Sequence, residues 1–416
     1  MNIPFKKHIL SNGLKVIASR DTTTSLCAFN LLYDVGAKDE NPEKTGFAHL
    51  FEHLMFGGSK NVKDFDEELE NIGGENNAFT NNDFTDYYIS VPREHIETAF
   101  RLESDRMQNL TINKTRLSVQ QKVVIEEYRQ RYLNQPYEDA SLFLRPLTFT
   151  RHPYRWSTIG KSIEHIESIT VEDVHNFYNT FYMPDNAILS VVGDIDADDV
   201  FAFAEKWFGS IPRGGRGVRS LPVEPIQVSP RLERVTRDVP ANALYRNYHI
   251  GGRGEESFYV FDMISDILSN GESSRLYIEL VKKERLFSDI DAYVSGDIEP
   301  GTFLISGRLN DGVSYEKACE GIERQLERVR TELVGDYELA KIKNKVETAL
   351  LFSNIKALDK ALNLAFFELL GGAEMIADEA KKYAAVTPLM LQQYASRHLI
   401  ESNCSALEYC AASLKK

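Results

Sequence analysis

The segment 44–57, KTGFAHLFEHLMFG, constrains this chain more than any other because it places the pattern His-x-x-Glu-His inside a predicted helix. Most of its residues are good helix formers, and two glycines follow where the helix would end. Residues four apart lie on one face of a helix, so His49 and His53 can direct their imidazoles to one point, with Glu52 close to that face. The other positions are apolar almost all round, which predicts a helix buried on most sides. Polar groups on such a helix need partners, and a divalent metal ion would satisfy them.

A plainer interpretation is that two core histidines each donate a hydrogen bond to a main-chain carbonyl. The chain has only 9 histidines, however, and two of them flank a glutamate at the spacing of the inverted zinc-peptidase helix. A catalytic zinc takes three protein ligands and keeps one open position, so a third donor is needed. The helix predicted over 114–133 contains Glu126 and Glu127 after an apolar run. Two adjacent residues of a helix face different ways, and spacing alone leaves both open, together with Glu103.

Length and composition limit the class of protein. A chain of 416 residues predicts two or three domains, and 43% hydrophobic with 26% charged residues is typical of a globular protein. The net charge of -14 argues against nucleic-acid binding, which needs a basic face. No apolar run reaches the length of a membrane span, and the first residues lack the apolar core of a signal peptide, so we expect a cytoplasmic protein that binds no membrane. The four cysteines form no Cys-x-x-Cys pair, and we expect them to be reduced.

The order of predicted elements indicates an α+β fold with mostly antiparallel sheets. Strands are expected at 15–18, 27–35, 76–80, 86–91 and 187–192, and helices at 64–72, 94–107 and 114–133. Residues 209–230 are rich in glycine and proline without apolar periodicity, and they read as a linker near the middle of the chain.

A repeat supports two homologous domains. Thr170 opens a predicted helix that leads to Asn186 and an apolar strand, and Thr387 opens one that leads to Asn403 and another apolar strand. The interval from threonine to asparagine is sixteen residues in both cases, which favours duplication of one α+β domain. We therefore predict a catalytic domain at 1–210, a linker at 211–232 and a homologous domain without the metal motif at 233–416.

These motifs together resemble the pitrilysin/insulinase family of zinc metallopeptidases. The resemblance rests on His49-Leu-Phe-Glu52-His53, on Val-Val-Ile-Glu-Glu127 further along the chain, and on Gly73-Gly-Glu-Asn-Asn77-Ala78-Phe79-Thr80. It extends through His152-Pro-Tyr and Asn186 to Val192-Gly-Asp, so it covers most of the first half and is weaker in the second. It is closest to the two-domain members, among them the beta subunit of the mitochondrial processing peptidase and bacterial homologues.

The resemblance implies a function. Within the family, His49, His53 and Glu127 correspond to the ligands of one zinc ion per chain, and Glu52 corresponds to the general base that activates the zinc-bound water. The strand containing Asn77, Ala78 and Phe79 corresponds to the exposed edge that takes the substrate as an added strand, a binding mode that suits extended or unfolded peptides. The resemblance also implies that two pairs of domains enclose the substrate in a clamshell.

Two departures from the family pattern bear on partners. Gln120 stands seven residues before Glu127, where active members usually carry a second glutamate. Active single-chain members also place an arginine and a tyrosine seven residues apart in the second domain, where alignment through 280–284 puts Lys282 and Asp289 here. We therefore expect a heterodimer with a related chain that supplies the Arg/Tyr pair, or failing that a homodimer.

Two other functions compete with the peptidase. A non-catalytic assembly subunit, like the core proteins of respiratory complexes, would have the same fold, but such proteins typically lose metal ligands. Another zinc hydrolase with the inverted motif, such as the thioether-cleaving enzyme of autoinducer synthesis, would be a much shorter chain with one domain.

Overall fold

The computed structural model describes residues 3–215 and 219–412, and the chain within them divides into two compact units. The first unit takes the chain up to Tyr128, with Trp156–Leu221 and Leu350–Asp378. The second takes Arg129–Arg155, Pro222–Ala349 and the chain from Glu379 onward. Residues 216–218 of the predicted linker lie outside the described residues.

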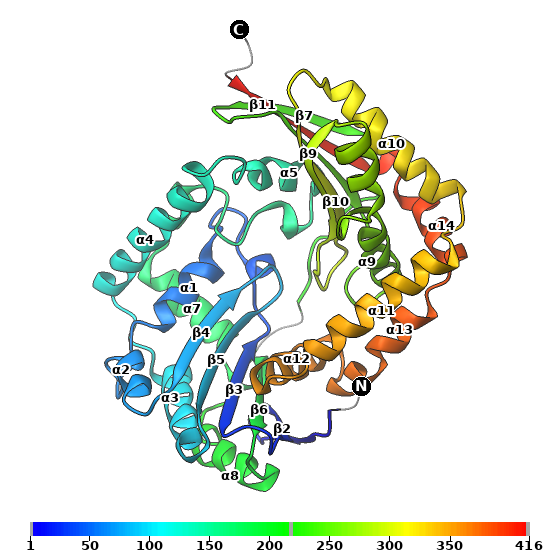
Figure 1. Ribbon diagram of the computed structural model, residues 1–416. Helices are drawn as coiled ribbons and strands as arrows, with labels where there is room; N and C mark the ends of the chain where they lie inside the picture. Colours follow the sequence, from blue (N-terminus) through cyan, green and yellow to red (C-terminus); the bar gives the residue numbers. More distant parts are fainter. Residues whose placement is uncertain (1–2, 216–218, 413–416) are drawn as a thin grey trace. The chain divides into compact units, whose positions relative to one another are not determined.

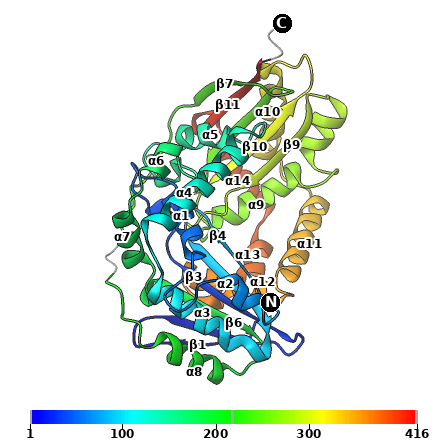
Figure 2. The same ribbon diagram turned by 90° about the vertical axis from the view of Figure 1, so that its left-hand side faces the viewer.

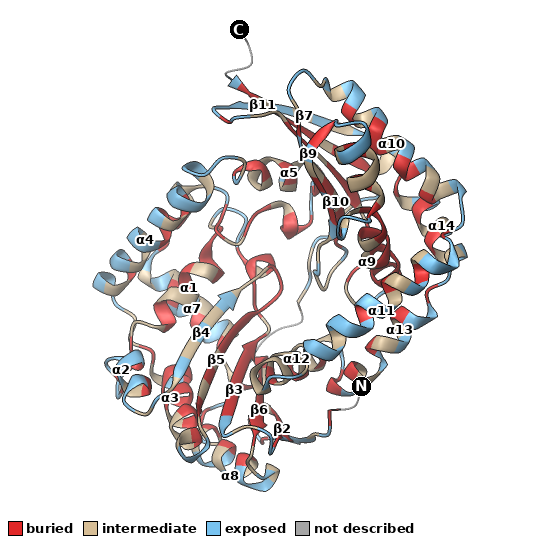
Figure 3. Ribbon diagram, viewed as in Figure 1, coloured by how far each residue is buried: buried red, intermediate tan, exposed pale blue. Residues whose placement is uncertain are grey.

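The first unit is built on a mixed sheet of six strands in the order β1-β2-β6-β3-β5-β4, as far as the described residues show. All neighbours are antiparallel except β2 and β6, which are parallel. Strands β3, β5 and β6 are largely buried, whereas β4 at the edge alternates exposed and half-buried residues (Figure 3). The strands are β1 (Lys6–Ile9), β2 (Lys15–Arg20), β3 (Leu26–Tyr33), β4 (Glu75–Thr80), β5 (Thr85–Pro92) and β6 (Ala187–Gly193).

Helices surround this first sheet. Helices α3 and α8 pack against each other and against the sheet, α1 packs against β4 and α4, and α12 packs against β3 and β6 (Figures 1 and 2). The helices of this unit are α1 (Phe47–Met55), α2 (Phe65–Glu70), α3 (Ile96–Asn109), α4 (Lys114–Tyr128), α6 (Ile163–Glu167), α7 (Val171–Phe181), α8 (Ala197–Phe208) and α12 (Ala357–Leu370). The strands and helices predicted from hydrophobic periodicity are thus present.

The described strands of the second unit, in the order β7-β11-β8-β10-β9, repeat the topology of β2-β6-β3-β5-β4, again with one parallel pair, β7 and β11. Its strands are β7 (Arg231–Arg237), β8 (Ala243–His249), β9 (Phe287–Val294), β10 (Thr302–Leu309) and β11 (Cys404–Ala411). Its helices are α5 (Ala140–Thr148), α9 (Glu256–Ser269), α10 (Tyr315–Thr331), most of α11 (Asp336–Phe352), α13 (Glu379–Ala385) and α14 (Pro388–His398), with a π-helical turn at Tyr277–Lys283. The predicted α+β class with two similar, mostly antiparallel domains is therefore confirmed.

The equal spacing of the two Thr-to-Asn segments has a structural cause. Thr170 and Thr387 cap α7 and α14 with their hydroxyl groups. Asn186 then donates its side-chain amide to the carbonyls of Phe181 and Asp34, and Asn403 donates to those of His398 and His249. Each asparagine thereby joins the end of a helix to the end of a central strand.

The compact units differ from the predicted contiguous domains in two segments. Helix α5 comes from the first half of the sequence but packs against β7, β8 and β11 of the second unit. Helix α12 comes from the second half but packs in the first unit. The two helices occupy the same place in the order of elements in each half, so the halves exchange equivalent helices. Amphipathic periodicity shows that a helix will cover an apolar surface, but it cannot say which sheet provides that surface.

Candidate metal centre

Helix α1 presents two histidines beside a buried apolar face. Phe47, Ala48, Leu50, Phe51, Leu54 and Met55 are buried, which holds the helix in the core of the first unit. The side chains of His49 and His53 keep 13% and 25% of their surface exposed, and their ring centroids lie 4.9 Å apart. The helix ends at Met55, and the main-chain N–H of Gly57 just beyond it donates to the carbonyl of Leu54. The predicted arrangement of two histidines one turn apart is therefore present.

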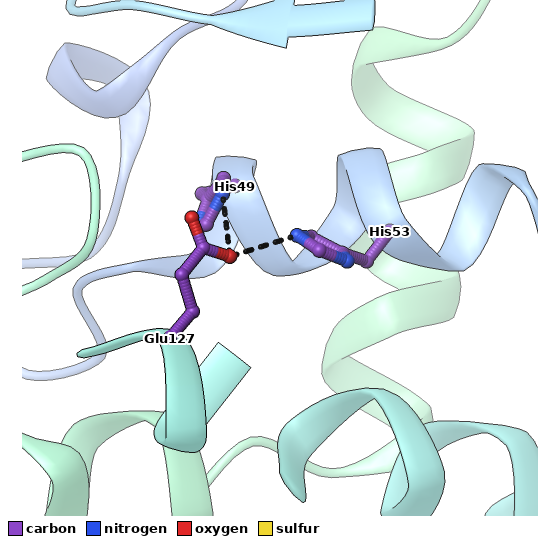
Figure 4. Close-up of side chains that lie close together, drawn as sticks. All are labelled: His49, His53 and Glu127. Carbon is purple, nitrogen blue, oxygen red and sulfur yellow. Dashed lines mark ion pairs between the residues drawn. The ribbon is translucent and has the colours of Figure 1, made fainter. Parts of the chain in front are cut away.

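Glu127 completes a group of three donors from two helices. Its Oε2 lies 3.6 Å from His49 Nε2 and 3.3 Å from His53 Nε2 (Figure 4). Zinc–nitrogen and zinc–oxygen bonds of about 2.0–2.2 Å in a tetrahedral arrangement separate two ligand atoms by about 3.3 Å. One ligand atom from each residue lies within 4.8 Å of the others, and the described part of the chain contains no second such group of His, Cys, Asp or Glu. Two neutral imidazoles and one carboxylate are a donor set of catalytic zinc sites, so these residues fit the ion.

The structure also separates the three glutamates that the sequence left open. Glu126, the neighbour of Glu127 on α4, is exposed. Glu103 is fully buried in α3 and accepts hydrogen bonds from the guanidinium of Arg106. Burial raises the pKa of Glu103, and the charge of Arg106 opposes that shift. Only Glu127 of these three is grouped with the histidines.

Glu52 lies between α1 and the edge strand. Its Oε2 accepts a hydrogen bond of 2.6 Å from the hydroxyl of Thr80, the last residue of β4. Sequence reasoning did not single out Thr80 as a partner, because nothing in the spacing of the two segments reveals that contact. The hydroxyl fixes one oxygen of Glu52 beside the strand that we predicted to bind substrate.

Strand β4 is the edge of the first sheet, which leaves one side of its main chain without a neighbouring strand. Asn77 and Phe79 are exposed and Ala78 is half-buried. The Asn77 Oδ1 accepts the main-chain N–H of Ala78 at 2.8 Å, so a side chain covers a main-chain donor of this edge. The strand has the form required for binding an extended peptide, and that role stays a prediction.

The positions aligned with the family Arg/Tyr pair have other neighbours in the second unit. Lys282 belongs to the π-helical turn, where its ammonium lies 5.1 Å from the ring centre of Tyr277. Asp289 lies on β9 and pairs with Arg308. The described residues thus place no arginine and tyrosine at these two positions.

Two buried charged residues that sequence reasoning missed stand before α1. Glu40 is 6% exposed, and its carboxylate accepts the main-chain N–H groups of Gly46 and Ala48 at 2.9 and 2.8 Å. Burial raises the pKa of Glu40 to about 8, while those hydrogen bonds oppose the rise. Lys38 is 3% exposed and forms an ion pair with Asp83. The signal in the sequence was three consecutive charged residues, 38–40, a few positions before an apolar helix.

No helix among the described residues has the length and apolar character needed to cross a membrane. The cytoplasmic location stays a prediction.

Comparisons with known proteins identify the family of the chain. Residues 15–159 match the family model described as "Insulinase (Peptidase family M16)", and residues 168–346 match "Peptidase M16 inactive domain". The chain is 30% identical over 340 residues to the zinc protease PqqE of Helicobacter pylori, which covers 80% of this chain and 76% of that protein. The chain therefore belongs to the insulinase family of peptidases, M16, as the resemblance implied.

Solved structures give the same fold. A protease from Helicobacter pylori superposes with a TM-score of 0.91 at 26% identity, over 98% of this chain and 100% of that one. The periplasmic protease PqqL of Escherichia coli superposes with a TM-score of 0.80 at 18% identity, over 99% of this chain but only 48% of that one. This chain thus corresponds to about half of the longer protein.

Proposed function

We propose that this chain is a zinc-dependent endopeptidase that hydrolyses extended or unfolded peptides. The observation that carries the proposal is the position of Glu127 Oε2, 3.6 and 3.3 Å from the two histidine Nε2 atoms. His49, His53 and Glu127 would hold one zinc ion. When bound, the ion supplies Lewis-acid chemistry, because it lowers the pKa of a water and polarises the scissile carbonyl.

Glu52 acts as the general base in this proposal. Glu52 immediately precedes the proposed ligand His53 in the sequence, and the hydroxyl of Thr80 orients its carboxylate. It takes the proton of the attacking water and passes it to the leaving amine. The main chain of β4 around Asn77, Ala78 and Phe79 aligns the peptide by hydrogen bonds that depend little on its side chains.

A second chain completes the enzyme in this proposal. This chain covers 48% of the longer protein PqqL. The positions aligned with the Arg/Tyr pair hold Lys282 and Asp289. We therefore propose a heterodimeric clamshell in which a related chain supplies the pair, with a homodimer as the alternative. Full activity of a purified homodimer would contradict the heterodimer but not the peptidase.

The test is hydrolysis of a quenched, unstructured peptide by zinc-loaded protein, with the partner chain present if activity requires it. Glu52→Gln should retain zinc and lose turnover by about 100-fold or more, since general acid–base catalysis typically contributes 10²–10⁴-fold. Glu126→Gln is the matched control, because that glutamate is exposed. A chelator should abolish wild-type activity. Wild-type turnover by Glu52→Gln would refute the assignment, and a zinc-loaded but inactive wild type would favour the assembly-subunit function.

A further inference from the structure

The segment Gly36–Glu40 follows β3 and precedes α1, and it contacts both parts of the proposed active site. One part is α1, which presents the two histidines and Glu52. The other is the hairpin of β4 and β5, whose edge strand faces the substrate in the proposed function. All the contacts described below lie within the first unit.

The first half of this segment holds the hairpin turn at residues 81–84. The main-chain N–H groups of Ala37 and Lys38 donate to the carbonyls of Asn81 and Asn82 at 3.0 and 2.9 Å. The ammonium of Lys38 donates to the carbonyl of Asp83 at 2.6 Å and lies 3.1 Å from its carboxylate. A Cβ on Gly36 would lie 2.6 Å from the main chain of Asn82, so the two loops approach as closely as only glycine permits.

The second half of the segment holds the first turn of α1. Gly46 occupies the N-cap position in the left-handed conformation, with φ of 85°, and has no side chain to cap the helix. A Cβ there would lie 2.6 Å from the carbonyl oxygen of Ile159, which excludes the usual capping residues. Glu40 replaces them from six residues away, by accepting the N–H groups of Gly46 and Ala48. The first turn of α1 has no acidic residue of its own, so the carboxyl oxygens of Glu40 are the side-chain acceptors for these N–H groups.

Between these two ends, Asp39 fixes the segment itself. Its carboxylate accepts the main-chain N–H of Gly36 at 3.0 Å and pairs with the guanidinium of Arg219 at 2.6 Å. The indole N–H of Trp156 donates to the carbonyl of Ala37 at 2.9 Å. The segment is therefore held by contacts of its own as well as at both ends.

We propose that Lys38 and Glu40 are positioning residues of the peptidase site, Glu40 for the metal-binding helix and Lys38 for the substrate-binding edge strand. The inference rests on the proposed function. Neither residue touches the reacting atoms. Glu40 sets the orientation of α1 from which His49 and His53 reach the metal, and Lys38 sets the position of the hairpin that ends beside Thr80 and Glu52.

The two roles predict effects on different kinetic parameters. Loss of one main-chain hydrogen bond at Glu40 loosens the start of α1, only one residue before His49, so zinc affinity and kcat should fall while KM changes little. Loss of the Lys38 contact loosens the turn at the end of β4, so KM should rise while zinc affinity and kcat stay near the wild-type values. General destabilisation would move all of these quantities together in either variant.

The variants are chosen to leave no buried charge unpaired. Glu40→Gln keeps the shape and one acceptor oxygen, and Glu40→Asp keeps the carboxyl group but shortens the reach. Lys38→Met is combined with Asp83→Asn, because Asp83 would otherwise stay buried without its cation. Lys38→Arg retains the cation and should restore a KM near that of the wild type.

The measurements are the zinc dissociation constant, kcat and KM for the quenched peptide, and hydrogen exchange of α1 and of the β4–β5 hairpin in zinc-free protein. Glu40→Gln should weaken zinc binding by about ten-fold, the lower end for residues that support ligands, and raise exchange in α1 only. Glu40→Asp should act in the same direction. Lys38→Met/Asp83→Asn should raise exchange in the hairpin and KM, without weakening zinc binding.

The inference would be overturned if the Glu40→Gln or the Lys38→Met/Asp83→Asn variant raised hydrogen exchange equally in α1 and in the β4–β5 hairpin. It would also be overturned if both Glu40 variants left the hydrogen exchange of α1 unchanged. Failure of the wild type to bind zinc or cleave peptide would instead refute the proposed function. Hydrogen exchange in the zinc-free protein would still decide whether each residue holds the element assigned to it.

Discussion

Glu127→Gln provides the sharpest test of the metal centre, because its neighbour Glu126 offers a control on the same helix. The substitution keeps the size of the side chain and removes the negative charge. In the structure, Glu127 Oε2 lies 3.3 and 3.6 Å from the histidine nitrogens, near the separation of about 3.3 Å expected between two tetrahedral zinc ligands. Substitution of residues that only support the metal ligands typically weakens metal binding by about 10–100-fold. Loss of a direct anionic ligand should therefore weaken zinc binding by at least about 100-fold.

That change in affinity has a calculable effect on stability. At a zinc concentration of about 100 times the wild-type Kd, binding to the folded state stabilises the protein by about 2.7 kcal/mol. A variant with a Kd about 100-fold higher would then be half-saturated, and zinc would stabilise it by only about 0.4 kcal/mol. Denaturant unfolding with and without zinc measures this difference, and competition with a chromophoric chelator measures Kd directly.

The exposed Glu126 should behave differently. Glu126→Gln should keep the wild-type Kd within about two-fold, since a surface charge near a site is strongly screened by solvent. The reasoning would be refuted if the Glu126 variant lost as much zinc affinity as the Glu127 variant. It would also be refuted if Glu127→Gln kept the zinc-dependent stabilisation of the wild type.

Two further predictions concern the exchanged helix α12 and its counterpart α5. Leu364→Ala removes a fully buried side chain of α12 and should lower the free energy of unfolding by about 2–5 kcal/mol, with faster hydrogen exchange in β3 and β6. Leu144→Ala in α5 should instead raise hydrogen exchange in β8 and β11. If each variant affected the strands assigned to the other, the two helices would not be swapped between the halves of the sequence. Asp21 is buried, which alone would raise its pKa, but hydrogen bonds from Lys360 of α12 and from Thr23 outweigh burial and hold the pKa at about 2. Asp21→Asn should therefore lower the free energy of unfolding at pH 7 by up to about 2.4 kcal/mol, and the difference from the wild type should disappear as pH falls from about 4 toward 2. A pH-independent difference in urea titrations would argue against this linkage.

The local part of the candidate site could be predicted from the sequence because helical periodicity alone places His49 and His53 on one face of α1. The choice of Glu127 could not come from the same source. It depends on how α4 packs against α1, and spacing along α4 is equally compatible with Glu126. Family resemblance selected Glu127, and the structure places it with the histidines.

Capping of α1 was unpredictable for a related reason. Local rules look for the capping side chain at the N-cap position, where this chain has Gly46. The close approach of Ile159 requires glycine there, and the cap then comes from Glu40, which precedes the N-cap by six residues. The contact with Ile159 thus explains why the N-cap position has no capping side chain and why the cap comes from Glu40 instead.

The repeated topology explains why, among the described residues, the metal group lies in one unit and has no counterpart in the other. Helices α1 and α9 occupy the same place in their units, as the first α-helix after the central strands β3 and β8. In α9 the residues from Ser257 to Ser265 are buried except Asp262, and Ile267 and Leu268 are buried as well. Helix α1 keeps a partly exposed face that contains both histidines and Glu52. The position that α9 fills with buried residues in one unit is thus the position at which α1 presents a partly exposed polar face toward Glu127 in the other. The hydrogen bonds of Asn186 and Asn403 between helix and strand are the same in both units, although among the described residues only one unit has a metal-binding group.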